Sequence, residues 1–263
     1  MEFLSVEQKN EIAYVTFENP KEYNTLTLRL LEELDQLLKE IAKKREVKVV
    51  VLQGNEKAFS AGHSLREIQK GDLQDVQHLF NTCMNVMKTF RAVPQLIVSK
   101  VRGVAVAAGT QVVAISDLAI ASEDARFATP GINSGLFCST PAVFLSRNIG
   151  RKKAAELLFT GNLMSAQEAL EHGLVNKVVP ADKLDEETDL WLEDITKQSL
   201  NIIELGKKQF YTQLQMTDFD ALAYATEVIS LNAKHPDAIE GINAFFEKRR
   251  PVWTDEKNKV DVT

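Results

Sequence analysis

The sequence predicts an α/β fold made of a parallel-stranded core followed by a helical C-terminal region. Up to Pro180, short valine- and isoleucine-rich runs alternate with segments in which leucines recur every three or four residues. Strands that alternate with amphipathic helices indicate parallel pairing, with each connecting helix packed on a face of the sheet. After Pro180 only helical periodicity remains, and no flexible linker separates the two parts. We therefore expect an α/β core over residues 1–180 and a helical region over residues 181–263 that share packing.

The expected strands are short. Residues 3–8 and 12–18 alternate apolar and polar side chains and are separated by a short polar segment, which predicts a hairpin. Residues 96–107 form a valine-rich run that is interrupted near Arg102 and Gly103. The other expected strands are residues 47–52, 117–122, 125–128 and 174–179.

The expected helices each have one apolar face. Within residues 27–44 the leucines and isoleucines lie three or four positions apart, as on one side of a helix. Residues 73–93 return to this spacing and end before Pro94, which cannot continue a helix. Between them, residues 58–64 are small and include a glycine, which predicts a loop. The expected C-terminal helices are residues 184–199, 202–214, 218–232 and 237–249.

The composition is typical of a globular protein and excludes some functions. Of the 263 residues 44% are hydrophobic, and the formal net charge is −6. Nucleic acid is therefore not expected as a partner, since phosphate binding usually needs a basic excess. No apolar run is long enough to span a membrane, and residues 1–15 carry no targeting pattern, so we expect a cytoplasmic protein, with an organellar mature form as the alternative. Cys83 and Cys138 are the only cysteines and have no metal-ligand spacing, so we expect no disulfide framework and no metal site.

Two glycine-containing segments are the candidate ligand-binding loops. Residues 57–65 and residues 101–110 each place small side chains directly after an expected strand. Small side chains let a ligand approach the main chain, and a helix that begins at Ala108 would direct free N–H groups at it. An oxyanion could be held there. The alternative is that these small residues serve only close packing or a turn.

Several segments, in this order, resemble the enoyl-CoA hydratase/isomerase (crotonase) superfamily over nearly the whole chain. They are residues 19–26 (NPKEYNTL), 59–62 (FSAG), 103–109 (GVAVAAG), 116–121 (SDLAIA), 159–161 (FTG), 165–175 (SAQEALEHGLV) and 244–251 (AFFEKRRP). The resemblance implies a core of repeated ββα turns arranged as a spiral, and C-terminal helices that build a homotrimer or a dimer of trimers. It also implies an acyl-CoA thioester as the ligand, with coenzyme A as part of the substrate and no separate cofactor.

The resemblance assigns an oxyanion hole to the main-chain N–H groups of His63 and Ala108. Two such donors that converge on a thioester oxygen stabilise the enolate formed in the transition state, and loss of one typically lowers the rate by about two to three powers of ten. The coenzyme A contacts that it implies are less specific, because lysines are usually solvated surface residues. These contacts are Lys21, the main chain of Ala61, His63 and Leu65, and Lys248, which could reach the coenzyme A of a neighbouring subunit.

The sequence departs from the family pattern at the positions of the two glutamates that hydratases use to add water. These positions hold Gln111 and Gly131, and neither side chain can accept a proton. General acid–base transfer contributes roughly two to four powers of ten in rate, so ordinary enoyl-CoA hydration is disfavoured.

Few other side chains could replace these glutamates. The imidazole of His63 titrates near neutral pH, and Glu67 lies close to the expected pocket. Ser139 and Thr140 lie near a position where some relatives carry a catalytic aspartate, although helix capping before Pro141 is the simpler interpretation.

Two further side chains have structural interpretations. Cys138 has the character of a small buried residue. Asp117 matches a structural aspartate of the family.

These observations leave three hypotheses. The first is an enzyme that performs an enolate-type reaction on an acyl-CoA thioester, such as isomerisation, thioester hydrolysis or a special hydration. The second is an acyl-CoA-binding or scaffolding protein that keeps the fold without the chemistry. The third is an unrelated α/β protein with coincidental glycine loops.

Overall fold

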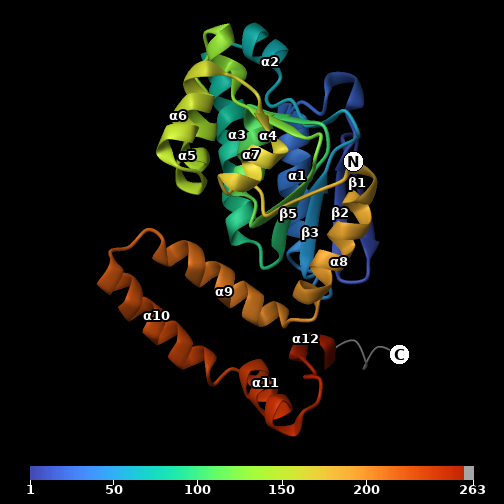
Figure 1. Cartoon of the computed structure of the whole chain (residues 1–263), viewed down its shortest axis with the longest axis vertical. Coiled ribbons are helices and arrows are strands. Elements are labelled where there is room, and N and C mark those ends of the chain that lie inside the picture. Colours follow the sequence, from blue (N-terminus) through green and yellow to red (C-terminus); the bar gives the residue numbers. More distant parts are fainter. Residues whose placement is uncertain (258–263) are drawn as a thin grey trace.

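A six-stranded sheet forms the centre of the core in the computed structural model, which describes residues 1–257 (Figure 1). In spatial order its strands are β1 (Leu4–Lys9), β2 (Ile12–Phe17), β3 (Val49–Gln53), β5 (Leu96–Val101), β7 (Leu118–Ser122) and β10 (Lys177–Val179). β1 and β2 form the expected antiparallel hairpin, and each other neighbouring pair is parallel. The parallel core predicted from the alternating pattern is therefore confirmed.

A second, four-stranded sheet lies beside the first. Its order is β4 (Ala58–Ser60), β6 (Val104–Val106), β8 (Arg126–Ala128) and β9 (Met164–Ser165). Each of β4, β6 and β8 follows a strand of the larger sheet and precedes a helix, which gives the expected series of ββα turns. The prediction of a loop over residues 58–64 was wrong in part, because three residues are too few for a strand pattern to show.

The core helices carry the buried leucines of the sequence pattern. α1 (Leu28–Ile41) buries six leucine and isoleucine side chains, and Thr27 caps it by accepting a hydrogen bond from the main chain of Leu30. The other core helices are α2 (Leu65–Lys70), α3 (Leu73–Ala92), α4 (Ala108–Ile115), α5 (Ser139–Asn148), α6 (Arg151–Thr160) and α7 (Ala166–Glu171). Short 3₁₀ helices are η1 (Pro20–Glu22), η2 (Pro130–Ser134) and η3 (Ala181–Lys183).

The C-terminal region consists of helices, as expected. α8 (Leu184–Thr196) covers the large sheet, where Leu192 packs with buried residues such as Val51 and Val98. The helices α9 (Leu200–Gln213), α10 (Asp218–Asn232), α11 (Pro236–Glu247) and α12 (Thr254–Lys257) extend away from the core, at the end opposite α2 (Figure 1). The division at residue 180 stays a prediction. Among residues 1–257 no helix is long and apolar enough to cross a lipid bilayer.

Asp117 joins α9 to the core. Its carboxylate accepts hydrogen bonds from the main-chain N–H of Ile97 at 2.7 Å and from the Tyr211 hydroxyl at 2.8 Å. The Lys207 ammonium lies 2.7 Å from the same carboxylate, and both side chains are almost fully buried. Arg91 completes the group and stacks on the Tyr211 ring. The structural role expected for Asp117 is confirmed.

Candidate functional site

The loop after β4 is fixed by a buried asparagine. Asn24 has a positive φ of 54°, and its side chain donates hydrogen bonds to the main-chain oxygens of Ala58 and Phe59. In return, the Ser60 hydroxyl donates to the main-chain oxygen of Asn24 at 2.8 Å. These bonds hold the segment that leads to Gly62 in one conformation. The sequence motif contained Asn24, but nothing in the motif alone indicated this role.

The first turn of α4 begins at a strained residue. Ala107 has φ 50° and ψ −117°, a main-chain conformation that residues other than glycine rarely adopt. Its N–H donates to the main-chain oxygen of Ala128 at 2.8 Å, and the Thr110 hydroxyl donates to the same oxygen at 2.9 Å. Strain that is held by several bonds in this way clusters at functional sites.

The two segments touch at Gly62. A Cβ atom built on Gly62 would lie 2.9 Å from the main-chain nitrogen of Ala108, which is closer than normal packing allows, and Gly62 also has φ 82°. A Cβ on Gly109 would lie 2.2 Å from the main-chain oxygen of Ser60. Only glycine fits at these two positions. The structure therefore brings the segment that carries His63 against Ala108.

Two main-chain donors are free at this contact. Within residues 1–257 the N–H groups of His63 and Ala108 donate no hydrogen bond. Ala108 is the first residue of α4, where unpaired N–H groups and the helix dipole favour a negative charge. Free main-chain N–H groups of this kind can donate hydrogen bonds to a negatively charged oxygen without any charged side chain.

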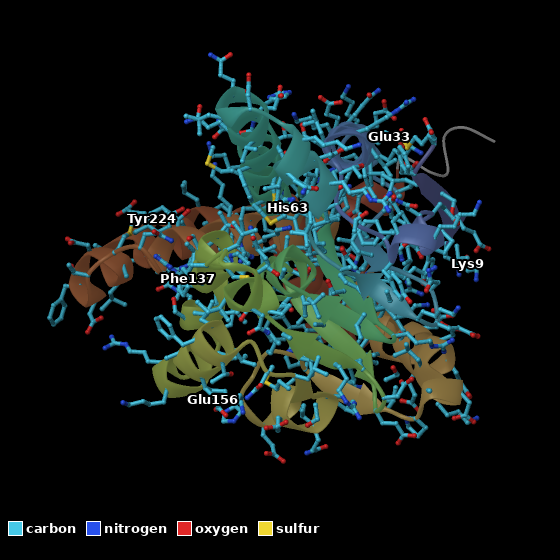
Figure 2. All side chains as sticks on the ribbon, turned by 90° about the horizontal axis from the view of Figure 1, so that it is seen from above. Lys9, Glu33, His63, Phe137, Glu156 and Tyr224 are labelled. Carbon is cyan, nitrogen blue, oxygen red and sulfur yellow. The ribbon has the colours of Figure 1, made fainter. Side chains whose placement is uncertain are left out.

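The His63 imidazole is held in an apolar environment. Its Nδ1 atom lies 3.3 Å from the main-chain oxygen of Leu26. Its ring packs edge-on against the Phe80 ring, with 4.9 Å between the two ring centroids. Burial lowers the pKa of this imidazole to about 4. The ring is therefore neutral at pH 7 and a weak base. In Figure 2 His63 lies toward the middle of the view, whereas Tyr224 lies on the C-terminal arm.

Gln111 lies one turn along α4 from Ala108. The residue is 2% exposed, and its side-chain oxygen has no hydrogen-bond partner among the described residues. The hydroxyl of Thr129, which is fully buried, also has no partner there. Buried polar atoms without partners are rare in folded proteins, so these two are candidates for contact with a ligand.

Gly131 lies in η2, where the chain turns tightly. A Cβ on Gly131 would lie 2.4 Å from the main-chain oxygen of Leu136 and 2.8 Å from the Cys138 sulfur. A glutamate at this position does not fit the present main chain. Cys138 is buried, and burial raises the pKa of its thiol, in agreement with the interpretation as a small buried residue.

The other proposed acids and nucleophiles have structural contacts. The Glu67 carboxylate accepts a hydrogen bond from the main chain of Leu28, so it caps the start of α1. Ser139 is exposed and donates to the main-chain oxygen of Phe137. The capping interpretation of Ser139 and Thr140 was wrong, because Cys138 is the N-cap of α5 and no side chain caps this helix.

The residues expected to contact coenzyme A lie in two places. Lys21 and Leu65 are exposed, and Ala61 is half-buried with its N–H donated to the main-chain oxygen of Tyr23. Lys248 is exposed at the end of α11, far from α2 in the same chain (Figure 1). One chain therefore does not bring Lys248 to the other residues.

A spiral of ββα turns with two paired glycine loops defines the structural class, and comparison with known proteins identifies the family. The model of the enoyl-CoA hydratase/isomerase family matches residues 7–257, so the chain belongs to this family. It is 43% identical to "Enoyl-CoA hydratase domain-containing protein 3, mitochondrial" of Rattus norvegicus over 95% of this chain and 84% of that protein.

Solved structures of related proteins agree with this family assignment. The crystal structure of the human enoyl-CoA hydratase domain-containing protein 3 has a TM-score of 0.92 at 41% identity and covers 95% of this chain and 100% of that chain. An enoyl-CoA hydratase structure from Mycobacterium smegmatis has a TM-score of 0.93 at 40% identity, over 96% and 99% of the two chains. These matches exclude an unrelated α/β protein.

Proposed function

We propose that the protein binds acyl-CoA thioesters and polarises the thioester carbonyl with the main-chain N–H groups of His63 and Ala108. The contact between Gly62 and Ala108 supports this proposal most directly, because it places the two free donors on adjacent segments. The carbonyl oxygen becomes negative as an enolate forms, and fixed donors stabilise that charge without reorganising. The reaction that follows is of the enolate type, with isomerisation, thioester hydrolysis and a special hydration as the alternatives.

Ordinary hydration of an enoyl-CoA is not the proposed activity. Gln111 cannot take a proton from water, and Gly131 has no side chain. The Nδ1 atom of His63 lies against the main-chain oxygen of Leu26, and the Glu67 carboxylate is bound to the main chain of α1. Proton transfer would have to come from the substrate, from solvent or from a neighbouring subunit.

These same observations favour a second candidate, a protein that binds acyl-CoA without turning it over. Crotonyl-CoA and a panel of saturated, branched and 3,4-unsaturated thioesters should be tested for turnover, with binding measured by calorimetry in parallel. Turnover of one thioester above buffer supports the enzyme. Binding without turnover supports the second candidate. Failure of every ester to bind contradicts both.

For coenzyme A we propose Lys21 and the main chain of Ala61, His63 and Leu65 as contacts, with Lys248 supplied by a neighbouring subunit. Coenzyme A arrives with the substrate, and no other cofactor or metal is proposed. Among the described residues no group of three histidine, cysteine or acidic side chains could hold a metal ion.

We propose a homotrimer or a dimer of trimers. The C-terminal helices expose large apolar side chains, including Phe219 at 85% and Phe245 at 78%, and a cavity of about 690 Å³ opens beside α11. Light scattering after size exclusion tests this state, and a monomer would contradict it. The cytoplasmic location stays a prediction. Because relatives are named as mitochondrial, imaging of the tagged chain should compare both compartments.

A further inference from the structure

A polar cavity lies on the face of the large sheet that α8 covers. It has a volume of about 360 Å³ and is lined by side chains from β1, β2, β3, β5 and α8. On the same face Leu192 of α8 packs with Val51 and Val98. Gln53 and Lys100 follow these two valines by two positions and are aligned with each other in the pairing of β3 with β5, so they point to this face as well. A cavity of this size can hold a small ligand.

Two ion pairs join charged side chains around this cavity. The Lys100 ammonium lies 2.6 Å from the Asp185 carboxylate, and the Lys9 ammonium lies 3.6 Å from the Glu7 carboxylate. The hydrogen bond from Lys100 lowers the pKa of the Asp185 carboxyl, and the positive charge of Arg102 lowers it further. Arg102 therefore lies in the same group of charges, although Asp185 is already paired with Lys100.

Three polar groups that line the cavity lack partners within the protein. Arg102 donates from Nη2 to the main-chain oxygen of Ala181 at 2.6 Å, but its buried Nε atom has no hydrogen-bond partner among residues 1–257. The buried side-chain oxygen of Gln53 has none there either. Asp189 accepts a hydrogen bond from the Tyr14 hydroxyl, and within the described residues neither Asp189 nor Arg102 forms an ion pair. One cation, one carboxylate and one acceptor are thus available to a ligand.

We propose that this cavity binds a free α-amino acid, at a site separate from the one for acyl-CoA. The ligand carboxylate pairs with the Arg102 guanidinium, whose planar fork suits a carboxylate. The ligand ammonium group has several donors, so it can donate to the Gln53 oxygen and pair with the Asp189 carboxylate. A ligand with a single charge would leave either Arg102 or Asp189 unpaired, and water supplies hydrogen bonds but no charge.

Calorimetry of the full-length protein tests the proposal, with a panel of L-α-amino acids that covers each side-chain class. Acetate and methylammonium are the probes that carry only one of the two charges. At least one amino acid should bind with a Kd below about 1 mM, and acetate and methylammonium should bind at least about tenfold more weakly. The proposal would be overturned if no amino acid bound at about 10 mM, or if one of the single-charge probes bound equally well.

Variants of the two unpaired charges show whether this cavity is the site. Arg102→Gln should weaken amino acid binding at least about tenfold and keep the affinity for butyryl-CoA within about twofold. The matched control is Arg147→Gln, because Arg147 also donates to a main-chain oxygen but is exposed on α5, and this variant should bind like the wild type.

Asp189→Asn tests the negative charge in a variant that should fold, since Asp189 is exposed. It should weaken amino acid binding by about threefold to fivefold. Circular dichroism checks the fold of each variant. Amino acid affinity within about twofold of the wild type in both Asp189→Asn and a folded Arg102→Gln would contradict the proposal. Because the two sites are separate, these results do not depend on whether the protein binds acyl-CoA.

Discussion

Gly62 and Ala108 are so close that a methyl group on the first would overlap the main-chain nitrogen of the second, with 2.9 Å between the two atoms. Glycine is therefore required at position 62 for two reasons, the positive φ and the close approach to Ala108. Gly62→Ala should lower the free energy of unfolding by about 2–3 kcal/mol, as left-handed strain and overpacking combine. It should also weaken acyl-CoA binding at least tenfold, measured by calorimetry.

Gly135→Ala is the matched control for this glycine. Gly135 has a similar φ of 73°, but nothing lies within 4 Å of the place that a methyl group on it would occupy. This variant should lose only about 1 kcal/mol of stability from backbone strain and keep its affinity for acyl-CoA. If both substitutions weakened acyl-CoA binding equally, the contact between Gly62 and Ala108 would not be what forms the binding site.

Ala108→Pro tests the main-chain donor directly. Proline lacks an N–H, so the substitution removes one proposed oxyanion donor. Because Ala107 has ψ −117°, outside the extended range that a residue before proline prefers, the variant should also lose some stability. Any measured turnover should fall by about two to three powers of ten. If the protein only binds, its affinity for acyl-CoA should fall about tenfold.

Arg151→Pro is the control for that substitution, because Arg151 is the exposed first residue of α6. Circular dichroism should show both variants folded, with only Ala108→Pro impaired. Unchanged binding and turnover in a folded Ala108→Pro protein would remove this N–H group from the mechanism.

The buried imidazole of His63 should make stability depend on pH. Its pKa is lowered from 6.5 to about 4 by burial, so the unfolded chain binds the proton more readily between these values. The stability that this ring contributes is complete above pH 6.5 and is lost as the pH falls toward 4. At pH 5 the loss should be about 2 kcal/mol relative to pH 7.

Urea unfolding at both pH values measures this loss in the wild type, in His63→Gln and in the control His172→Gln. Because His172 is exposed, its variant should keep the wild-type pH dependence. The His63 variant should lose about 2 kcal/mol less between pH 7 and pH 5. A wild-type pH dependence in His63→Gln would contradict a lowered pKa of this imidazole in the folded protein.

Sequence periodicity predicted the elements that are long or repeat a clear pattern. The predicted bounds of α1 and α3 are close to the observed ones, because the apolar side chains of each helix face one core. β4, α5 and α7 were missed, since elements of three to ten residues show too little of a pattern. Sequence motifs identified the glycine loops, but the unpartnered atoms of Gln111 and Thr129 depend on which distant side chains approach them, and this requires the folded structure.

The position of the second missing glutamate leads to the last prediction. Gly131 contacts the main-chain oxygen of Leu136, so even a methyl group would have to displace the η2 turn. Gly131→Ala should therefore lower the free energy of unfolding by about 1–3 kcal/mol, whereas Gly150→Ala, which has open space around it, should change it by less than about 1 kcal/mol.

Restoring both glutamates should consequently fail to restore hydration. In Gln111→Glu with Gly131→Glu the second carboxylate cannot occupy its position without moving the main chain. The rate of crotonyl-CoA hydration, measured as the loss of absorbance of the enoyl thioester, should therefore stay within tenfold of the wild-type rate. Gln111→Glu alone is the control, because its side chain fits the existing space. Strong hydration by the double variant, beyond that of the single one, would show that the η2 turn opens readily and that only the proton-transfer groups are missing.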